Sequence, residues 1–331
     1  MEDQSDRQGI GWRVRGGRCA RYLAIFLFAL LGSAWAVDPE VGWEPAKTWV
    51  MAVGVLEWNA SDLYCSFPKA GRRDAALVQF FRDQGVPDSQ IIFLKDKQAT
   101  KSRIEQSLVA MLDQTRPGDL LVIYYAGHGV EEEGTTCFAN YDITGKTLKS
   151  GWQVPAIFDA IERHYLGSRV LLMADACNSG ALGVEAENRR SKIAYASLAS
   201  VQPEEESTGN WTFTECVLKG LRGDPAVDLN SDGRVTLDEL ARYTKRKMSS
   251  AESQKAWFST ANGFSSNMIL SQTKGGPKAG GQAGGKVEAL WHGKWWPASV
   301  LQSVKGKTLI HYDGYGAEWD EWVGTDRLRS Q

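Results

Sequence analysis

The most constraining feature of this sequence is a series of apolar runs that show no alternation with polar residues and that are separated by segments with a helical period. A strand buried on both faces forms a continuous apolar run, which is typical of parallel sheets covered by helices. The pattern predicts an α/β fold over residues 37–272, a mainly parallel sheet sandwiched by helices, with an active site at the carboxyl ends of the strands. The predicted strands are 49–55, 91–94, 119–125, 168–174 and 193–198, and the predicted helices are 73–84, 101–114 and 155–165.

Composition and charge exclude several classes of protein. Hydrophobic residues make up 43% of the 331 residues and charged residues 24%, which excludes a disordered chain, a fibrous repeat and a coiled coil. The 38 Lys and Arg residues are balanced by 40 Asp and Glu residues, a net charge of -2. Because the chain has no general basic field, no nucleic-acid partner is expected.

The first 36 residues have the pattern of a secretory signal peptide. Four arginines between residues 13 and 21 precede an apolar run at 22–31, and the small residues Ala34 and Ala36 follow it. This order predicts cleavage after Ala36 and a secreted or periplasmic protein. The run is shorter than the roughly 18–20 apolar residues that span a membrane, so no stable membrane insertion is expected after cleavage. The alternative is an uncleaved anchor.

The end of the chain has a composition of its own. Six glycines within 275–285 indicate a flexible linker at 273–285. Five of the 13 tryptophans fall in the last 41 residues, where short alternating segments are broken by glycine. These segments predict a small all-β, SH3-like barrel over 286–331, in which the tryptophans are expected to supply much of the core. Its four predicted strands are 287–291, 295–304, 308–313 and 318–323.

Two predicted strands end in polar loops that carry a histidine and a cysteine. His128 follows strand 119–125, and Cys177 follows strand 168–174. Because the carboxyl ends of parallel strands lie along one edge of a sheet, the imidazole and the thiol are expected to meet across a cleft. A thiol attacks carbonyl carbon as the thiolate, and a neighbouring histidine removes its proton and later protonates the leaving amine. The alternative for Cys177 alone is a buried structural cysteine.

The residues around this pair, YYAGHG and DACNSG, resemble the histidine and cysteine motifs of caspase-like cysteine peptidases, particularly metacaspases and their bacterial relatives. The resemblance covers roughly 48–272, and His128 precedes Cys177 by 49 residues, close to the spacing in caspases. It implies that Cys177 is the nucleophile, that His128 is the base, and that the N–H groups of Gly129 and Cys177 form the oxyanion hole. The other histidines are assigned to a helix surface or to the barrel, namely His164, His292 and His311.

The same resemblance implies a substrate preference. Metacaspases cleave after Arg or Lys, and an acidic pocket recognises that charge. Asp175 occupies the acidic position of the family two residues before the nucleophile, and Asp74 aligns with a second such position. The alternative for Asp175 is a structural carboxylate that caps loop N–H groups, and the neighbouring Arg73 is a cation that would alter a pocket at Asp74.

Residues 228–239 match the pattern of an EF-hand calcium loop at every specified position. Oxygen ligands at positions 1, 3 and 5, a glycine at position 6 and a glutamate at position 12 suit Ca²⁺. The preceding helical segment ends at 223–225, and the alternative is a turn with structural carboxylates. No cofactor is expected for the chemistry itself, and Ca²⁺ is the expected regulatory or structural ion. The candidate ligands are Asp228, Asn230, Asp232, Arg234, Thr236 and Glu239.

The segment 286–328 is similar to Tudor-knot and chromo-barrel domains. In such barrels, aromatic rings enclose a methylated cation through cation–π attraction. The resemblance therefore implies a methylated or cationic peptide as a partner, and the alternative is that the rings only fill a small core. The candidate cage residues are Trp291, Trp296, Tyr312, Tyr315 and Trp319.

Together these features predict an exported cysteine endopeptidase that cleaves after basic residues and carries a C-terminal recognition barrel. The alternative is a non-catalytic adaptor, a caspase-like scaffold joined to a peptide-binding barrel. The polar segment 183–192 shows no apolar period, which predicts an exposed loop. Because relatives process themselves in the corresponding region, the resemblance implies self-cleavage after Arg189 or Arg190.

Overall fold

The computed structural model describes six stretches of the chain. The predicted signal peptide at 1–36, nearly all of the predicted linker at 273–285, and His292 lie outside the described residues. The described stretches are 42–145, 148–273, 285–291, 293–304, 307–315 and 319–330.

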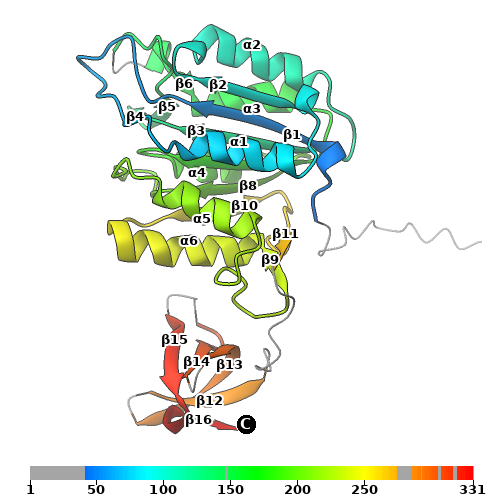
Figure 1. Cartoon of the computed structure of the whole chain (residues 1–331), viewed down its shortest axis with the longest axis vertical. Helices are drawn as coiled ribbons and strands as arrows, with labels where there is room; N and C mark the ends of the chain where they lie inside the picture. The colour runs from blue at the N-terminus through cyan, green and yellow to red at the C-terminus, as the bar shows by residue number, and fades with distance from the viewer. Residues whose placement is uncertain are drawn as a thin grey trace, which may run out of the picture. The chain divides into compact units, whose positions relative to one another are not determined.

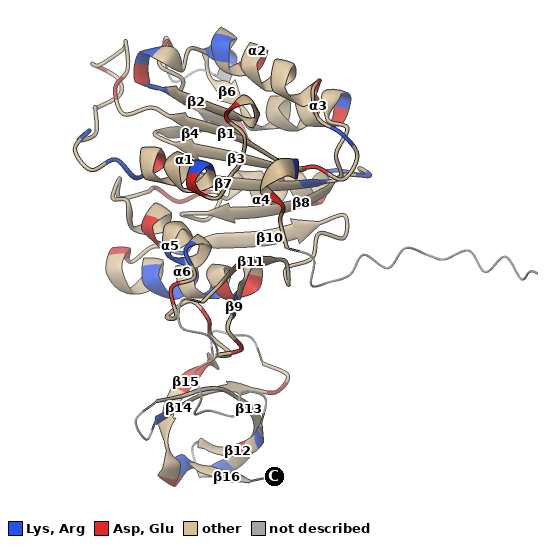
Figure 2. Ribbon diagram, turned by 45° about the vertical axis from the view of Figure 1, so that its right-hand side comes forward, with Lys and Arg blue, Asp and Glu red and all other residues tan. Residues whose placement is uncertain are grey.

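The main sheet has six strands in the order β10-β8-β7-β3-β1-β2 (Figure 1). Within this sheet, five strands are parallel to one another, namely β1, β2, β3, β7 and β8. The sixth, β10, runs antiparallel to β8. β1 and β3 are buried along their whole length, as the unbroken apolar runs predict. Figure 2 shows these strands almost free of Lys, Arg, Asp and Glu. The strands are β1 (Thr48–Gly54), β2 (Ile91–Lys95), β3 (Leu120–Ala126), β7 (Arg169–Asp175), β8 (Ala194–Ala199) and β10 (Trp257–Ala261).

Helices cover both faces of this sheet. Successive residues of a strand point to opposite faces, so Met51 of β1 packs into one hydrophobic cluster and Val50 into the other. The first cluster includes apolar residues of α2 (Lys101–Leu112), α3 (Val154–His164) and α4 (Ala181–Asn188). The second includes those of α1 (Arg73–Asp83), α5 (Thr212–Leu221) and α6 (Leu237–Glu252). The α/β class and the mainly parallel sheet are therefore confirmed.

Short antiparallel strands, which the apolar pattern did not reveal, complete the α/β unit. Their lengths of two to four residues are too short for a clear period. Three of them form a small sheet directly after His128, and two others form a separate pair. They are β4 (Gly129–Glu132), β5 (Thr135–Phe138), β6 (Trp152–Gln153), β9 (Arg234–Thr236) and β11 (Ile269–Gln272).

The predicted exposed loop at 183–192 is wrong, because helix α4 occupies its first half. Leu182 and Ala186, one helical turn apart, are buried in the core and hold the helix on the sheet. Arg189 at the helix end pairs with Asp159 at 2.6 Å and also bonds Glu162, Glu185 and the carbonyl of Pro155. Cleavage after Arg189 would therefore require the end of α4 to unfold, whereas Arg190 is exposed.

The C-terminal segment forms a curled antiparallel sheet of five strands in the order β15-β14-β13-β12-β16. The prediction of four strands missed β16, which pairs with β12. The expectation that tryptophans fill the core is also wrong, because Trp291, Trp319 and Trp322 are exposed and the core consists of Ala289, Ala298, Ile310, Tyr312 and Val323. The strands are β12 (Lys286–Trp291), β13 (Lys294–Val304), β14 (Lys307–Tyr312), β15 (Glu321–Gly324) and β16 (Leu328–Ser330).

Within the described stretches, a helix of the length and apolar character needed to cross a membrane does not occur.

Candidate functional site

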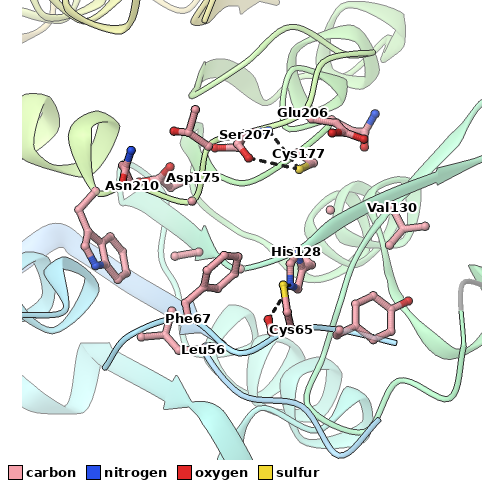
Figure 3. Close-up of a pocket in the computed structure, with 18 of the residues that line it drawn as sticks. Leu56, Cys65, Phe67, His128, Val130, Asp175, Cys177, Glu206, Ser207 and Asn210 are labelled. Atoms are coloured by element: carbon pink, nitrogen blue, oxygen red, sulfur yellow. Dashed lines mark hydrogen bonds between the residues drawn. The ribbon is translucent and has the colours of Figure 1, made fainter. Parts of the chain in front are cut away.

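The candidate nucleophile and base lie at the ends of two adjacent parallel strands. β3 and β7 pair in register to their last residues, Ala126 opposite Asp175. His128 and Cys177 each follow this last pair by two residues, so both side chains emerge at the same edge of the sheet. Both line a cleft of about 800 Å³. Figure 3 shows Cys177 on one side of this cleft, beside Ser207, and His128 on the other, beside Cys65.

Backbone N–H groups surround the thiol of Cys177. The N–H of Ser207 donates to Cys177 Sγ at 3.1 Å, and the N–H groups of Gly129 and of Cys177 itself lower the pKa of the thiol. Burial raises the pKa of this thiol, and the three donors oppose the rise because they favour the thiolate. Cys137 and Cys216, buried away from the cleft, have pKa values raised to about 11. Cys177 thus keeps a raised pKa, although backbone donors around it favour the thiolate.

Local backbone geometry explains the glycine and asparagine in the two motifs. A side chain at position 129 would overlap the carbonyl oxygen of Cys177, so only glycine allows the two loops to approach. Asn178, directly after Cys177, has φ of +56°, a left-handed conformation that asparagine tolerates better than most residues. Its N–H donates to the carbonyl of Glu205 at 2.9 Å, which ties the Cys177 turn to the loop after β8.

The ring of His128 is held by Cys65, whose backbone carbonyl bonds it and whose Sγ lies 3.8 Å from His128 Nε2. His128 Nε2 lies 2.9 Å from the carbonyl oxygen of Cys65. A carbonyl only accepts hydrogen bonds, so Nε2 carries the proton, and in the neutral ring Nδ1 is the nitrogen that accepts one. Burial lowers the pKa of His128 below its usual value, which favours this neutral form. The imidazole is therefore arranged to act as a base.

Asp175 is a buried carboxylate in the wall of the cleft. Thr214 donates to Asp175 Oδ2 twice, from its hydroxyl at 2.6 Å and its N–H at 3.3 Å. Burial raises the pKa of Asp175 to about 7 despite these donors. Among the residues that the structure describes, no Lys or Arg forms an ion pair with it. Asp175 is thus hydrogen-bonded, as a structural carboxylate would be. It also has no described counter-ion, so a cation that enters the cleft could pair with it.

Asp74 does not line the cleft, so its assignment to the substrate pocket is wrong. Its side chain is fully buried, and Arg72 binds it with two hydrogen bonds of 2.8 and 2.5 Å. Arg72 also pairs with Asp96 at 2.8 Å. The cation that neutralises Asp74 is therefore Arg72, while Arg73 pairs with Glu215 at the surface.

Sequence reasoning missed most of the acidic groups of the cleft. Besides Asp175, the cleft is lined by Glu131, Glu204 and Glu206, and Lys and Arg do not occur among its described lining residues. Glu206 is close enough to Cys177 to raise the pKa of the thiol. Three consecutive glutamates, 204–206, directly after a strand that ends at this edge were the available signal. The cleft therefore attracts cations.

The candidate calcium loop is folded around its own carboxylates. Glu239 Oε1 accepts the N–H groups of Leu229 and Asn230, and its Oε2 accepts the N–H and hydroxyl of Thr236, the capping box of α6. Asp228 accepts the N–H groups of Asp232 and Gly233. In the described part of the chain, His, Cys, Asp and Glu do not gather in threes around a possible metal position. In this arrangement Glu239, at loop position 12, caps helix α6, and its carboxylate does not fit a calcium coordination sphere. Another candidate ligand, Arg234, donates its backbone N–H to Asp232.

The five candidate cage residues come together on the C-terminal sheet. Trp291, Trp296, Tyr312, Tyr315 and Trp319 line one cavity of about 60 Å³. Trp291 packs edge-on against Trp296 and Trp319, and Tyr315 does the same with Trp296, at centroid distances of 5.7–6.3 Å. The ammonium of Lys294 lies 4.5 Å from the centroid of Trp296. The rings thus form an aromatic wall in which one ring already faces a cation.

Comparisons with known proteins leave this chain without an assigned family. No model of a known protein family matches it, and neither does any curated protein. Among solved structures, it is similar to a Geobacter sulfurreducens protein that was a structural genomics target, at 14% identity and a TM-score of 0.49. That similarity covers 69% of this chain and 100% of the other.

Proposed function

We propose that this protein is an exported, caspase-like cysteine endopeptidase that cleaves peptide bonds after Arg or Lys. The observation that carries the proposal is the common cleft of Cys177 and His128, reached from adjacent parallel strands with backbone N–H groups at the sulfur. The caspase-like identity rests on the two motifs, and export rests on the sequence of residues 1–36 alone.

In the proposed reaction, Cys177 Sγ attacks the carbonyl carbon of the scissile bond while His128 Nδ1 takes the thiol proton. The raised pKa of Cys177 and the lowered pKa of His128 both favour a neutral pair before substrate binds, so the proton moves during the attack. The N–H groups of Gly129 and Cys177 hold the oxyanion. The C–N bond then breaks, the amine leaves with the proton from His128, and water activated by His128 hydrolyses the thioester.

The preference for basic residues follows from the charge of the cleft. A carboxylate buried at Asp175 has lost its hydration, and an arginine or lysine side chain from the substrate would restore a counter-ion. Glu131, Glu204 and Glu206 add to the negative field through which such a substrate approaches.

The test compares turnover of fluorogenic peptides that end in Arg, Lys or Asp, with and without calcium. Cys177→Ala and His128→Ala should each lower kcat/KM at least about 10³-fold. Cys216→Ala and His164→Gln are matched controls, since one cysteine is buried away from the cleft and one histidine pairs with Asp113 at the surface. Full activity of Cys177→Ala would contradict the dyad. Wild-type protein that cleaves none of the peptides would favour the non-catalytic adaptor.

We propose a second function for the barrel, the binding of a quaternary ammonium group such as trimethyl-lysine in a peptide. It is favoured by the cavity that the five aromatic rings line, because a methylated cation needs ring faces and no hydrogen-bond acceptor. Calorimetry with full-length Cys177→Ala protein should show tighter binding of a trimethyl-lysine peptide than of the unmodified peptide. Equal affinities would leave the rings without this function.

A further inference from the structure

Three aromatic rings surround His128, and all three come from the segment between β1 and α1. The centroid of the imidazole lies 4.5 Å from that of Trp58, 4.7 Å from that of Phe67 and 5.7 Å from that of Tyr64. Trp58 also contacts the other two rings, at 5.8 Å from Phe67 and 6.1 Å from Tyr64. The three rings form one continuous group, which we call the aromatic box.

Hydrogen bonds anchor the aromatic box to the backbone that carries His128. Trp58 Nε1 donates to the carbonyl of Ala139 at 3.0 Å, and the N–H of Ala139 donates to the carbonyl of His128 at 2.9 Å. The hydroxyl of Tyr64 donates to the carbonyl of Gly145 at 2.6 Å, and the N–H of Phe67 donates to that of Leu56. Trp58 is thus linked to the backbone of His128 through Ala139, while Tyr64 and Phe67 are held by Gly145 and Leu56.

The box shields the ring of His128 from water, and two of its rings, Tyr64 and Phe67, line the cleft whereas Trp58 does not. Trp58 and Tyr64 are each 4% exposed, whereas Phe67 is half-buried at the cleft wall, where a side chain on Gly209 would meet its ring. Phe67 is therefore the ring whose removal would admit water with the least damage to the core.

We infer that Trp58 and Phe67 are positioning residues for His128, whose rings fix the plane of the imidazole and keep it dehydrated. This inference rests on the proposed peptidase function. A base confined in one orientation needs no reorganisation before proton transfer, and dehydration disfavours the imidazolium. The rings act through His128, and nothing requires them to contact the substrate.

The test is a histidine NMR titration of full-length protein, combined with pH profiles of kcat/KM. The chain has only four histidines, so the resonance missing in His128→Ala identifies His128. In Phe67→Ala, the pKa of His128 should rise toward its usual value of about 6.5. The acidic limb of the kcat/KM profile should move upward with it, lowering kcat/KM up to about fourfold near pH 6. Phe67→Tyr keeps an aromatic ring and should leave the pKa of His128 and the pH profile as in the wild type. Phe67→Leu keeps most of the volume without a ring and should shift both in the same direction as Phe67→Ala.

Trp43 offers a matched control. Its indole N–H also donates to a backbone carbonyl, that of Leu270, and its ring also packs against two others, Phe80 and Phe81, away from the cleft. Trp58→Phe should shift the His128 titration, and Trp43→Phe should leave it in place. An unchanged titration in Phe67→Ala, or an equal shift in Trp43→Phe, would overturn the inference. Because the titration needs no substrate, it decides this point even if the protein cleaves no peptide.

Discussion

The cleft of the α/β unit and the aromatic cavity of the barrel both suit cations, but they do so by different physics. The cleft has a volume of about 800 Å³ and is lined by four carboxylates together with the Cys177 and His128 pair. The cavity has a volume of about 60 Å³ and is lined by five aromatic rings alone. One attracts a cation by full charges, and the other by the negative faces of π systems.

This difference sets how each site should respond to its surroundings. Carboxylates titrate and are screened by salt, whereas a ring quadrupole does neither. Burial raises the pKa of Tyr312, the one buried cage ring, to about 12, so the cavity keeps its charge state across the ordinary range. Binding in the cleft should therefore depend on pH and ionic strength, and binding in the cavity should not.

The largest effect is expected from Asp175→Asn. The variant should lower the ratio of kcat/KM for Arg over citrulline, a neutral isostere, about 100-fold, because the substrate cation loses its buried partner. The rate on the citrulline peptide itself should change little. Paired assays of the two peptides measure this ratio, and a ratio equal to that of the wild type would place the specificity elsewhere in the cleft.

The next effect is expected from Trp296→Ala in the cavity. Loss of this ring should weaken the binding of a trimethyl-lysine peptide about 30-fold, since a desolvated cation–π contact is worth about 2 kcal/mol. Trp322→Ala is the control for loss of a tryptophan from the same sheet, because Trp322 is exposed and does not line the cavity, whereas Trp296 is half-buried. If calorimetry finds that both variants bind the trimethyl-lysine peptide equally weakly, the tryptophans contribute to the stability of this sheet and not to contact with the peptide.

A smaller effect is expected from pH. Because burial raises the pKa of Asp175 to about 7, the Arg to citrulline ratio should rise about tenfold between about pH 6 and pH 8, as the carboxylate ionises. Peptide binding to the cavity should stay constant over this range.

The raised pKa means that the folded state binds this proton more tightly than the unfolded state, so the contribution of Asp175 to stability is lost as pH rises through about 7. The Tm of Asp175→Asn should therefore not show this loss as pH rises. Thermal unfolding of both proteins over the same pH series measures it, and an equal loss in both would contradict the prediction.

The smallest effect is expected from salt. Raising NaCl from about 50 mM to about 500 mM should lower the Arg to citrulline ratio about threefold, because the exposed Glu204 and Glu206 are screened while Asp175 is largely sheltered. The Kd for the trimethyl-lysine peptide should change less than about twofold. Equal salt dependence at both sites would remove the distinction between them.

Part of the site could be predicted because it follows from strand direction. Parallel strands that end at one edge bring His128 and Cys177 together, whatever the details of packing, and the register of Ala126 with Asp175 places them in one cleft. The aromatic cavity was also within reach of the sequence, since its five rings cluster in a segment too small to bury them all.

Other features depended on contacts between distant segments. Asp74 and Asp175 occupy equivalent positions in the motif resemblance, yet Arg72 neutralises the first and no described cation pairs with the second. Helix α4 was missed because only a few buried apolar residues, Leu182 and Ala186 among them, hold it in place. The aromatic box around His128 comes from residues 61 to 70 positions earlier in the chain, for which local pattern carries no signal.

The sequence by itself determined the α/β class, the position of His128 and Cys177 at one edge of the sheet and the gathering of aromatic residues at the C-terminus. Hydrophobic periodicity and the order of the strands depend on residues that are close in the chain, so they can be predicted from the sequence. The tertiary structure decided which carboxylates face the cleft, which rings enclose His128 and which N–H groups the loop carboxylates of residues 228–239 accept. Each of those outcomes depends on burial and on partners far away in the chain, and only packing brings such groups within a few ångströms of one another.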